Sequence, residues 1–212
     1  MEHKRKVKIS ELKNPQMYSR FINEPAPCVC VSGNLDITNV YKQKRFGHKL
    51  NALLCYCILQ AAQNIEEFHY SIQKDGLYYY DFVKTNAVLI GKDNQHYYGD
   101  YKYFDNFEDF EKEYERVNKY CIENCTHFSE DTGSLIATSA IVGYPFTSIS
   151  LGVSTEFLDH FIMWGKYEKH LFKKTLNISL RFHHAIIDGG LAAKFFNELQ
   201  RQFKTLKTKK SK

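Results

Sequence analysis

The stretch Phe182-His183-His184-Ala185-Ile186-Ile187-Asp188-Gly189-Gly190 carries the clearest chemical pattern of the chain. It ends a run of alternating apolar residues, which predicts a β-strand over 176–183. Neighbouring side chains of a strand point to opposite faces, so only one of the two histidines can enter a given pocket. The glycines after Asp188 allow a sharp turn, and the apolar spacing of 191–203 predicts a helix beyond it.

Three interpretations of this stretch are open from the residues alone. A histidine at a strand end with a carboxylate nearby suits a general base, because imidazole titrates near neutral pH and a fixed partner sets its tautomer. A buried or surface histidine pair beside a plain Asp-Gly turn fits the spacing equally well. A metal site is less favoured, because only two or three candidate ligands lie here.

The rest of the chain indicates one mixed α and β domain over 1–203, because it contains no repeat and no Pro/Gly/Ser-rich linker. The order of the elements predicts a mixed sheet with helices packed on it. We expect strands at 27–31, 35–38, 68–73, 77–83, 85–91, 135–140, 146–153 and 176–183, helices at 42–64, 107–124 and 191–203, and leave 155–164 ambiguous.

Composition excludes several classes of protein. The net charge of +5 comes partly from the Lys-rich tail 204–212, which we interpret as a solvated, frayed terminus rather than a nucleic-acid-binding arm. No other basic stripe with stacking aromatics is present, so no nucleic-acid partner is expected. No apolar run approaches the ~20 residues that span a membrane. The N-terminus lacks the apolar core of a secretion signal, so we expect a cytoplasmic protein.

The six cysteines form three closely spaced pairs, 28/30, 55/57 and 121/125. C-x-C is not the C-x₂-C spacing of common zinc sites, and no histidine cluster completes a ligand set. Buried free thiols are therefore favoured over a metal site, and disulfides are not expected in a reducing cytosol.

The segment His183–Gly189 resembles the H-H-A-x-x-D-G motif of chloramphenicol acetyltransferases, whose looser form the acyltransferase cores of 2-oxo acid dehydrogenase complexes share. The resemblance runs from about Val7 to Phe203, and its markers keep their order. Similar to family segments are Leu35–Thr38, Glu67–Gly76, Tyr80–Val83, Phe146–Ser148, Leu151–Val153, Gly165–Tyr167 and Asn197–Gln200.

The resemblance implies an α/β fold, an α+β two-layer sandwich with a large mixed sheet and helices packed on one side. It implies a homotrimer with the sheet extended across the interface and active sites between subunits. The implied activity is transfer of an acetyl group from acetyl-CoA to a hydroxyl of chloramphenicol or a related small molecule, directly in a ternary complex and without a metal. Antibiotic resistance would follow from that activity.

The resemblance also implies roles for particular residues. His184 would be the general base, Ser139 would stabilise the oxyanion, and Asp188 would hold the loop and the orientation of the histidine. Lys166 and Tyr167 would approach coenzyme A. The acceptor would contact Phe21, Val29, Phe128, Ile149 and Leu151, with Tyr97 and Tyr98 near a pocket loop, so we expect an apolar but reshaped pocket. For Ser139 an ordinary strand hydroxyl, and for Lys166 and Tyr167 a solvated turn, stay as alternatives.

The chain departs from the family pattern at three points. Asn14 replaces an arginine that pairs with the motif aspartate, and Lys13 is a candidate substitute. Val142-Gly143 replaces a Pro-Trp pair, and Met163 replaces a threonine that holds an ordered water. These changes leave two other hypotheses open, an acyltransferase with another donor or acceptor and a non-catalytic trimer that binds a ligand or partner. Intact His184, Asp188 and Ser139 favour an enzyme.

Overall fold

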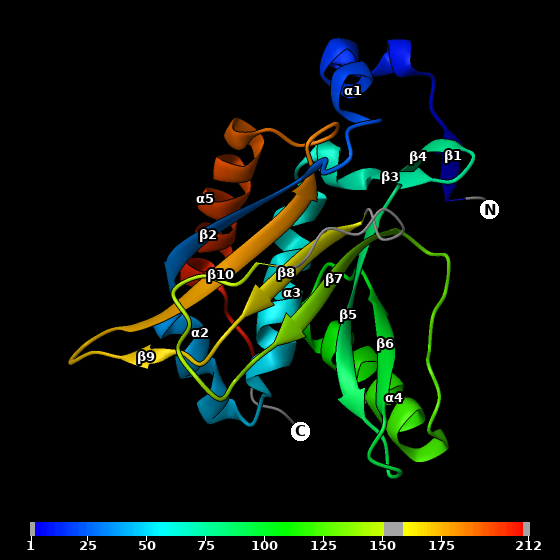
Figure 1. Ribbon diagram of the computed structural model, residues 1–212. Helices are drawn as coiled ribbons and strands as arrows, with labels where there is room; N and C mark the ends of the chain where they lie inside the picture. The colour runs from blue at the N-terminus through cyan, green and yellow to red at the C-terminus, as the bar shows by residue number, and fades with distance from the viewer. Residues whose placement is uncertain (1–2, 151–158, 210–212) are drawn as a thin grey trace.

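A large mixed sheet forms the centre of the protein in a computed structural model, which describes residues 3–150 and 159–209 (Figure 1). Its strand order is β2-β10-β8-β7-β5-β6, with β9 paired to β10. The β5–β7 and β7–β8 pairs are parallel, and the other pairs are antiparallel. The bounds are β2 Cys28–Asp36, β5 Val83–Ile90, β6 His96–Lys102, β7 Ser134–Ala140, β8 His160–Trp164, β9 Glu168–Lys169 and β10 Lys174–His183.

Strand β10 lies second from one edge of this sheet, between β2 and β8. It pairs with β2 from Thr175 opposite Asp36 to His183 opposite Cys28, and with β8 on its other side. Its alternating apolar side chains are at most 2% exposed and lie in the core, as the sequence pattern predicts. These side chains are Leu176, Ile178, Leu180 and Phe182.

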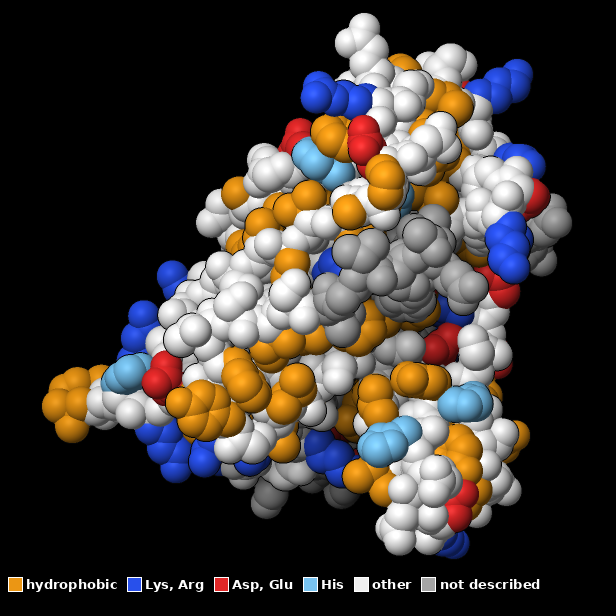
Figure 2. Space-filling model, viewed as in Figure 1, with side chains coloured by type: hydrophobic (Ala, Val, Ile, Leu, Met, Phe, Trp, Pro, Cys, Tyr) orange, Lys and Arg blue, Asp and Glu red, His pale blue; other side chains and the backbone are white. Residues whose placement is uncertain are grey.

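The long helices cover one face of the sheet, which confirms the predicted two-layer arrangement (Figure 1). Helix α5 shows why they pack there, because Phe195, Leu199 and Phe203 recur at helical spacing and are fully buried. The opposite face carries no helix, and Figure 2 shows hydrophobic side chains gathered over it. The helices are α1 Pro15–Phe21, α2 Thr38–Gln43, α3 Leu50–Gln63, α4 Phe107–Asn124 and α5 Gly189–Thr205.

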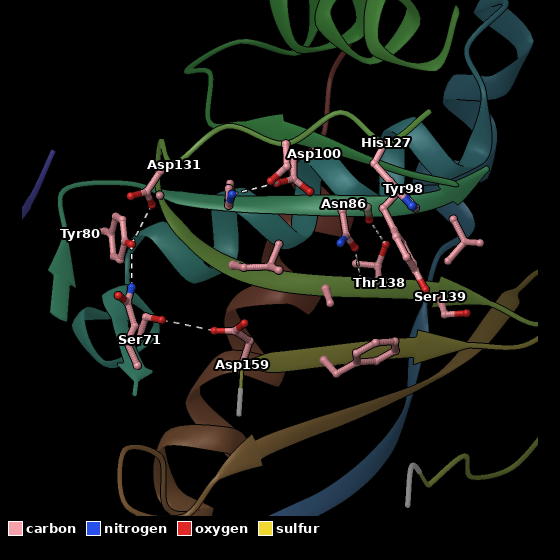
Figure 3. Close-up of a pocket in the computed structure, with 18 residues that line it drawn as sticks. Ser71, Tyr80, Asn86, Tyr98, Asp100, His127, Asp131, Thr138, Ser139 and Asp159 are labelled. Atoms are coloured by element: carbon pink, nitrogen blue, oxygen red, sulfur yellow. Dashed lines mark hydrogen bonds and ion pairs between the residues drawn. The ribbon is translucent and has the colours of Figure 1, made fainter. Parts of the chain in front are cut away.

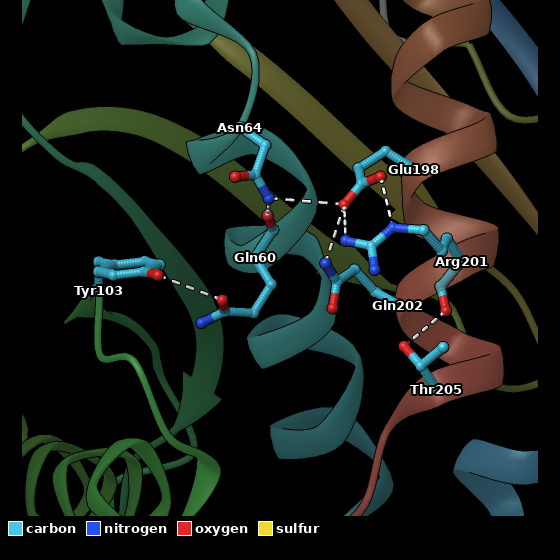
Figure 4. A network of polar contacts seen from close by, with 7 residues as sticks. All are labelled: Gln60, Asn64, Tyr103, Glu198, Arg201, Gln202 and Thr205. Carbon is cyan, nitrogen blue, oxygen red and sulfur yellow. Dashed lines mark hydrogen bonds and ion pairs between the residues drawn. The ribbon is translucent and has the colours of Figure 1, made fainter.

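A polar network at the solvent edge joins α3 to α5 (Figure 4). The Glu198 carboxylate accepts hydrogen bonds from Arg201 and Gln202 of its own helix and from Asn64 at the end of α3. The hydrogen bonds from Arg201 hold the pKa of Glu198 below its usual value. One carboxylate therefore joins the C-terminal end of α3 to the second half of α5.

A second, three-stranded sheet of order β1-β4-β3 lies beside one end of the large sheet. Its β3–β4 hairpin turns at Asp75-Gly76, as predicted, and Gly76 has a φ of 144° that favours glycine. The bounds are β1 Lys4–Lys6, β3 Tyr70–Gln73 and β4 Gly76–Tyr80, and three 3₁₀ turns are η1 Ile9–Glu11, η2 Lys44–Phe46 and η3 Glu66–His69.

Two elements differ from the sequence prediction for backbone reasons. The helix expected over 42–64 is divided, because Gly47 has a φ of 101° that ends the first part and lets the chain turn into α3. The strand expected over 146–153 does not form within 146–150. That segment instead crosses β2 and β10 and uses side-chain contacts, with Ile149 N donating to Ser179 Oγ at 3.0 Å. Residues 151–153 lie outside the described part of the chain.

The C-terminal tail is packed rather than frayed as far as Lys209. Leu206 is only 7% exposed, and Thr208 N donates to the side chain of Gln43. The ring of His48 donates from Nε2 to the Lys209 carbonyl at 2.7 Å, while its Nδ1 contacts the Glu111 carboxylate. The predicted boundary at 203 also falls inside α5, which continues to Thr205.

The cysteines are free thiols, and three of them lie in the core. Burial raises the pKa of Cys55 to about 12. In 3–150 and 159–209 no group of three or more histidine, cysteine or acidic residues has the geometry of a metal site, and no helix there is long and apolar enough to cross a bilayer.

The packed tail gives a first prediction. Leu206→Ala should lower the free energy of unfolding by about 2 kcal/mol, because it leaves a cavity under the tail. The control is the exposed neighbour Lys207, and Lys207→Ala should change the free energy of unfolding by less than about 0.5 kcal/mol. Urea unfolding measures both, and equal stability of the two variants would show that the tail is not docked in solution.

Candidate active site

His184 lies immediately after β10, at the start of the turn that leads to α5. Its backbone N–H donates to the Pro27 carbonyl at 2.8 Å, and its Nδ1 lies 3.2 Å from the Ile187 carbonyl. A carbonyl oxygen only accepts, so Nδ1 carries the proton and Nε2 keeps its lone pair. The ring stacks on Phe21 with centroids 4.1 Å apart. The half-buried imidazole is thus oriented with Nε2 able to accept a proton.

His183 is the opposite case, as the strand alternation requires. It is 1% exposed, and its Nδ1 accepts a hydrogen bond from Ala185 N at 3.1 Å. Burial lowers the pKa of His183 to about 4, and the nearby charges of His184 and Arg181 act in the same direction. Of the two rings, only that of His184 is partly exposed.

Asp188 serves as the N-cap of α5. Its Oδ1 accepts from Leu191 N at 2.8 Å, which anchors the turn that also positions His184. Asn14 caps α1 in the same way, through Met17 N. Lys13 pairs with Glu66 at 2.7 Å. Among the described residues Asp188 has no ion pair, so Lys13 does not substitute for the family arginine.

A cavity of about 760 Å³ lies on the helix-free face of the sheet (Figure 3). Its floor comes from β5, β6, β7 and β8, and its walls come from 127–133 and the β3–β4 hairpin. Ala137, Leu135 and Phe161 supply apolar surface, while Asp100 and Asp159 supply carboxylates. The lining therefore combines apolar surface, as expected for the acceptor pocket, with carboxylates that the sequence interpretation did not include.

Ser139 lines this cavity from β7. The strand beneath it is fixed to β5 by Asn86, whose Oδ1 accepts from Thr138 N at 2.9 Å and whose carbonyl accepts from the Thr138 hydroxyl. No hydrogen bond joins the Ser139 hydroxyl to another described residue. The hydroxyl is therefore available to a molecule in the cavity.

His184 and Ser139 do not meet within one chain. The register places Ser139 opposite Met163 of β8, which lies opposite Ser179 of β10, and His184 follows five residues later. Two strand spacings and five residue rises separate the two α-carbons by about 19 Å. The imidazole and the hydroxyl therefore cannot touch the same reacting group of one bound molecule.

The predicted acceptor residues are also dispersed. Phe21 lies against His184, whereas the Phe128 ring packs on Arg116 of α4 and leaves its neighbours His127 and Ser129 to line the cavity. Val29 lies opposite Phe182 in the sheet, and Ile149 lies over β10. Leu151 lies outside the described residues.

Lys166 and Tyr167 belong to a third group of side chains, beyond the end of β8. Gly165 permits the close approach of the chain there, since a Cβ would lie 2.7 Å from the Tyr144 carbonyl, to which Lys166 N donates. The rings of Tyr167 and Tyr41 lie 5.1 Å apart. We call the contacts around these rings the lysine–tyrosine cluster, made of Tyr41, Lys44, Tyr167, Lys169 and Lys174, with Lys166 next to it in the chain.

The cluster has a strongly positive surface. Lys174 Nζ lies 4.6 Å from the centre of the Tyr41 ring. A hydrogen bond from Tyr167 lowers the pKa of Tyr41, and Lys44, Lys169 and Lys174 lower it further through their charges. Two aromatic faces within a ring of ammonium groups suit a ligand that combines a flat ring with phosphates.

The sequence interpretation missed the carboxylates of the cavity. Asp159 was left in an ambiguous segment, and Asp100 lies on β6, which was not predicted. Signals for β6 exist in the tyrosines of 97–101 and in the loop Gly91–Gln95 before it, where Asn94 has a φ of 62°, but the sequence interpretation did not use them.

Comparison with known proteins gives a consistent result. The family model described as chloramphenicol acetyltransferase matches residues 2–200. Chloramphenicol acetyltransferases of Clostridium butyricum and Clostridium perfringens are 26% and 27% identical to this chain, each over 92% of both chains. A solved chloramphenicol acetyltransferase structure has a TM-score of 0.81 at 21% identity, covering 94% of this chain and 99% of its own. A probable dihydrolipoamide acetyltransferase from Listeria monocytogenes 4b F2365 has a TM-score of 0.69 at 13% identity, covering 98% of this chain and 97% of its own.

Behind His183, a second imidazole is sealed in the core. His160 is 3% exposed, lies 4.8 Å from the Phe68 ring centre and has no hydrogen-bond partner among the described residues. Burial lowers its pKa to about 3, and the charges of His183 and Arg181 add to the effect.

These two lowered pKa values predict acid sensitivity. An unfolded histidine has a pKa near 6.5. Below that pH the unfolded chain binds protons that the folded chain does not bind, so the free energy of unfolding falls as the pH falls toward the folded pKa values. His160→Leu should reduce the slope of the unfolding free energy between about pH 7 and pH 5 by up to ~1.4 kcal/mol per pH unit. Urea unfolding at several pH values measures it. The exposed His96→Leu is the control, and an equal reduction in that variant would contradict the assignment.

Proposed function

The chain belongs to the chloramphenicol acetyltransferase family and is an acyltransferase, and from this premise we propose that it transfers an acetyl group from acetyl-CoA to a hydroxyl of a small molecule in the cytoplasm. The observation that carries the proposal is the His184 ring, whose Nδ1–H is held by the Ile187 carbonyl and whose Nε2 is left as a base. Chloramphenicol is the first acceptor to test, because the relatives carry its name, and resistance to that antibiotic would follow from its acetylation.

In the proposed reaction His184 Nε2 takes the proton of the acceptor hydroxyl. The oxygen then attacks the thioester carbonyl, and the resulting oxyanion accepts a hydrogen bond from Ser139. Collapse breaks the carbon–sulfur bond, and the proton on His184 passes to the departing thiolate. Base catalysis of this kind contributes about 10²–10⁴ in rate, and one oxyanion donor about 10²–10³. Transfer is direct, so no acyl group resides on the protein.

The separation of about 19 Å between His184 and Ser139 supports a site shared between chains. The cavity opens on the face that carries no helix, where a second chain can reach it. We propose a homotrimer in which His184 of one chain faces the cavity of the next and the sheet continues across the interface.

The lysine–tyrosine cluster is the proposed contact for coenzyme A. Its aromatic faces suit the adenine ring, and its lysines suit the phosphates. Tyr167 belongs to the cluster, and we propose that Lys166 next to it also contacts coenzyme A.

Two alternatives stay under test, a different acceptor and a non-catalytic binding protein. The second is favoured by the lack of an ion pair at Asp188 among the described residues, because Asn14 stands in place of the family arginine and Lys13 pairs with Glu66. The helix cap made by Asp188 nevertheless keeps the loop after His184 in place without that arginine.

Release of free thiol from acetyl-CoA, with and without chloramphenicol and with a panel of other alcohols, tests the activity. His184→Ala should reduce acceptor-dependent release by at least about 10³-fold, because the base is lost. The control is His96→Ala, which changes an exposed side chain at the start of β6 and should leave the rate unchanged. Release with other alcohols alone would exclude chloramphenicol, and no release with any alcohol from a folded protein would support the non-catalytic alternative.

The shared site makes a separate prediction. Co-expression of His184→Ala chains with Ser139→Ala chains should yield mixed oligomers more active than either variant alone, because a boundary between the two can combine an intact imidazole with an intact hydroxyl. Activity of the mixture is compared with that of the two variants purified separately and then combined without exchange. If mixed oligomers form without any gain, each site lies within one chain.

A further inference from the structure

The cavity beside Ser139 has two chemically different ends (Figure 3). Ser139 and Tyr98 lie at one end, next to the apolar Ala137. At the other end Ser71 and Asp159 face each other. Four residues along β8 and one strand spacing separate the α-carbons of Ser139 and Asp159 by about 14 Å. A molecule that reaches both ends is therefore elongated.

Two of the three carboxylates in the cavity are already neutralised by the protein. Asp100 accepts from Lys84 Nζ at 2.8 Å and from the Ser129 hydroxyl at 2.6 Å. Asp131 accepts from Lys4 Nζ at 2.5 Å and from the Tyr80 hydroxyl at 2.8 Å. These groups have their charge and their lone pairs engaged, so they offer little to a ligand.

Asp159 is different. Within 3–150 and 159–209 its carboxylate has no ion pair, and the Ser71 hydroxyl at 3.3 Å is the hydrogen-bond donor to it. Arg181 on the neighbouring strand donates to the backbone carbonyl of Asp159, at 3.4 Å, rather than to the carboxylate.

The surroundings of Asp159 disfavour the charged form of its carboxyl group. Burial raises its pKa, and the charge of Asp100 adds to that effect, while Ser71, Lys84 and Arg181 oppose it. A half-buried carboxylate with one hydrogen-bond donor gains from a further donor that reaches it inside the cavity, because water competes less there than in bulk solvent.

Building on the proposed function, we propose that Asp159 selects acceptors that carry a hydrogen-bond donor, an ammonium or a second hydroxyl, at the end opposite to the hydroxyl that is acetylated. Such an acceptor binds with its donor on Asp159 and its reacting hydroxyl near Ser139. The apolar surface between the two ends fits a hydrocarbon or ring linker. An acceptor whose far end is purely apolar leaves the carboxylate facing a group that cannot donate.

Matched series of linear alcohols test this selection and separate the two kinds of donor. The series are ω-amino alcohols, ω-trimethylammonium alcohols, α,ω-diols and n-alkanols of increasing length, with ester products identified by mass spectrometry. In the wild type, kcat/KM should favour donor-bearing acceptors of matching length over alkanols by about tenfold to a hundredfold. A preference for amino alcohols alone identifies an ammonium, and an equal preference for diols identifies a neutral donor. If kcat/KM for the trimethylammonium alcohols equals that for the amino alcohols, Asp159 recognises positive charge rather than a hydrogen-bond donor. That result would overturn the hydrogen-bonding proposal.

Variants then assign the preference to Asp159. Asp159→Leu should abolish it and improve alkanols, and Asp159→Asn should remove most of the ammonium preference. The control is Asp131→Asn, in the same cavity but already paired with Lys4, which should keep the ratio within about threefold. Equal loss of the ratio in the control, or an unchanged ratio in Asp159→Leu, would overturn the assignment.

A binding measurement keeps this inference separate from the proposed function. Without acetyl-CoA, a long amino alcohol should raise the melting temperature of the wild type and not that of Asp159→Leu, whereas the matched alkanol should not discriminate between them. That pattern without any turnover would support the selection by Asp159 and contradict the transferase reaction. Turnover that is equal for alkanols and amino alcohols would do the reverse.

Discussion

The pairing of β10 with strands on both of its sides is the constraint on which the molecule depends. Its ladder with β2 ends where His183 lies opposite Cys28, and the Pro27 carbonyl then holds the backbone of His184. Because the strand alternates, sealing one imidazole in the core leaves the next one at the surface. The N-cap made by Asp188 closes the turn immediately afterwards, so the position of His184 follows from backbone hydrogen bonds on either side of it.

The same sheet that fixes the histidine also keeps it away from the cavity. Helices cover one face, and the other face presents Ser139, Asp159 and apolar side chains to whatever approaches it. A single chain thus holds a base and a hydroxyl-lined cavity in two separate places. The proposed reaction requires His184 of one chain to reach the Ser139 cavity of another. A helix on the open face would block that approach.

The helices and strands that could be predicted from the sequence were those with a local pattern of apolar residues. The amphipathic residues of 107–124 and the alternation of 176–183 predicted α4 and β10 well, since each pattern reports burial on one face. The break at Gly47 was missed, because apolar spacing continues across it while the backbone turns. Strand β6 was missed although the Gly91–Gln95 loop before it carries turn residues, because the sequence interpretation ended its last strand of that hairpin at 91 and assigned nothing to 96–102.

The site shows the same division between local and long-range information. The sequence predicted that Asp188 orients the loop after His184, whereas the partner of the ring is the Ile187 carbonyl and Asp188 caps α5. The cavity does not follow from sequence spacing. Phe128 turned toward α4 because the extended chain there places its neighbours on the cavity side. Asp159 faces Ser71 through a contact that spans 88 positions, which no local pattern can report.

The place of β10 in the chain also governs when the protein can form. Its partner β2 is complete by Asp36, yet β10 begins only at Lys174, so a growing chain makes most of its residues before β2 can join the sheet through β10. Until then β2 has an open edge, and contacts this distant in sequence are slow to close. We therefore expect the large sheet to be completed only after β10 has been synthesised, and the unpaired β2 edge to favour aggregation until then.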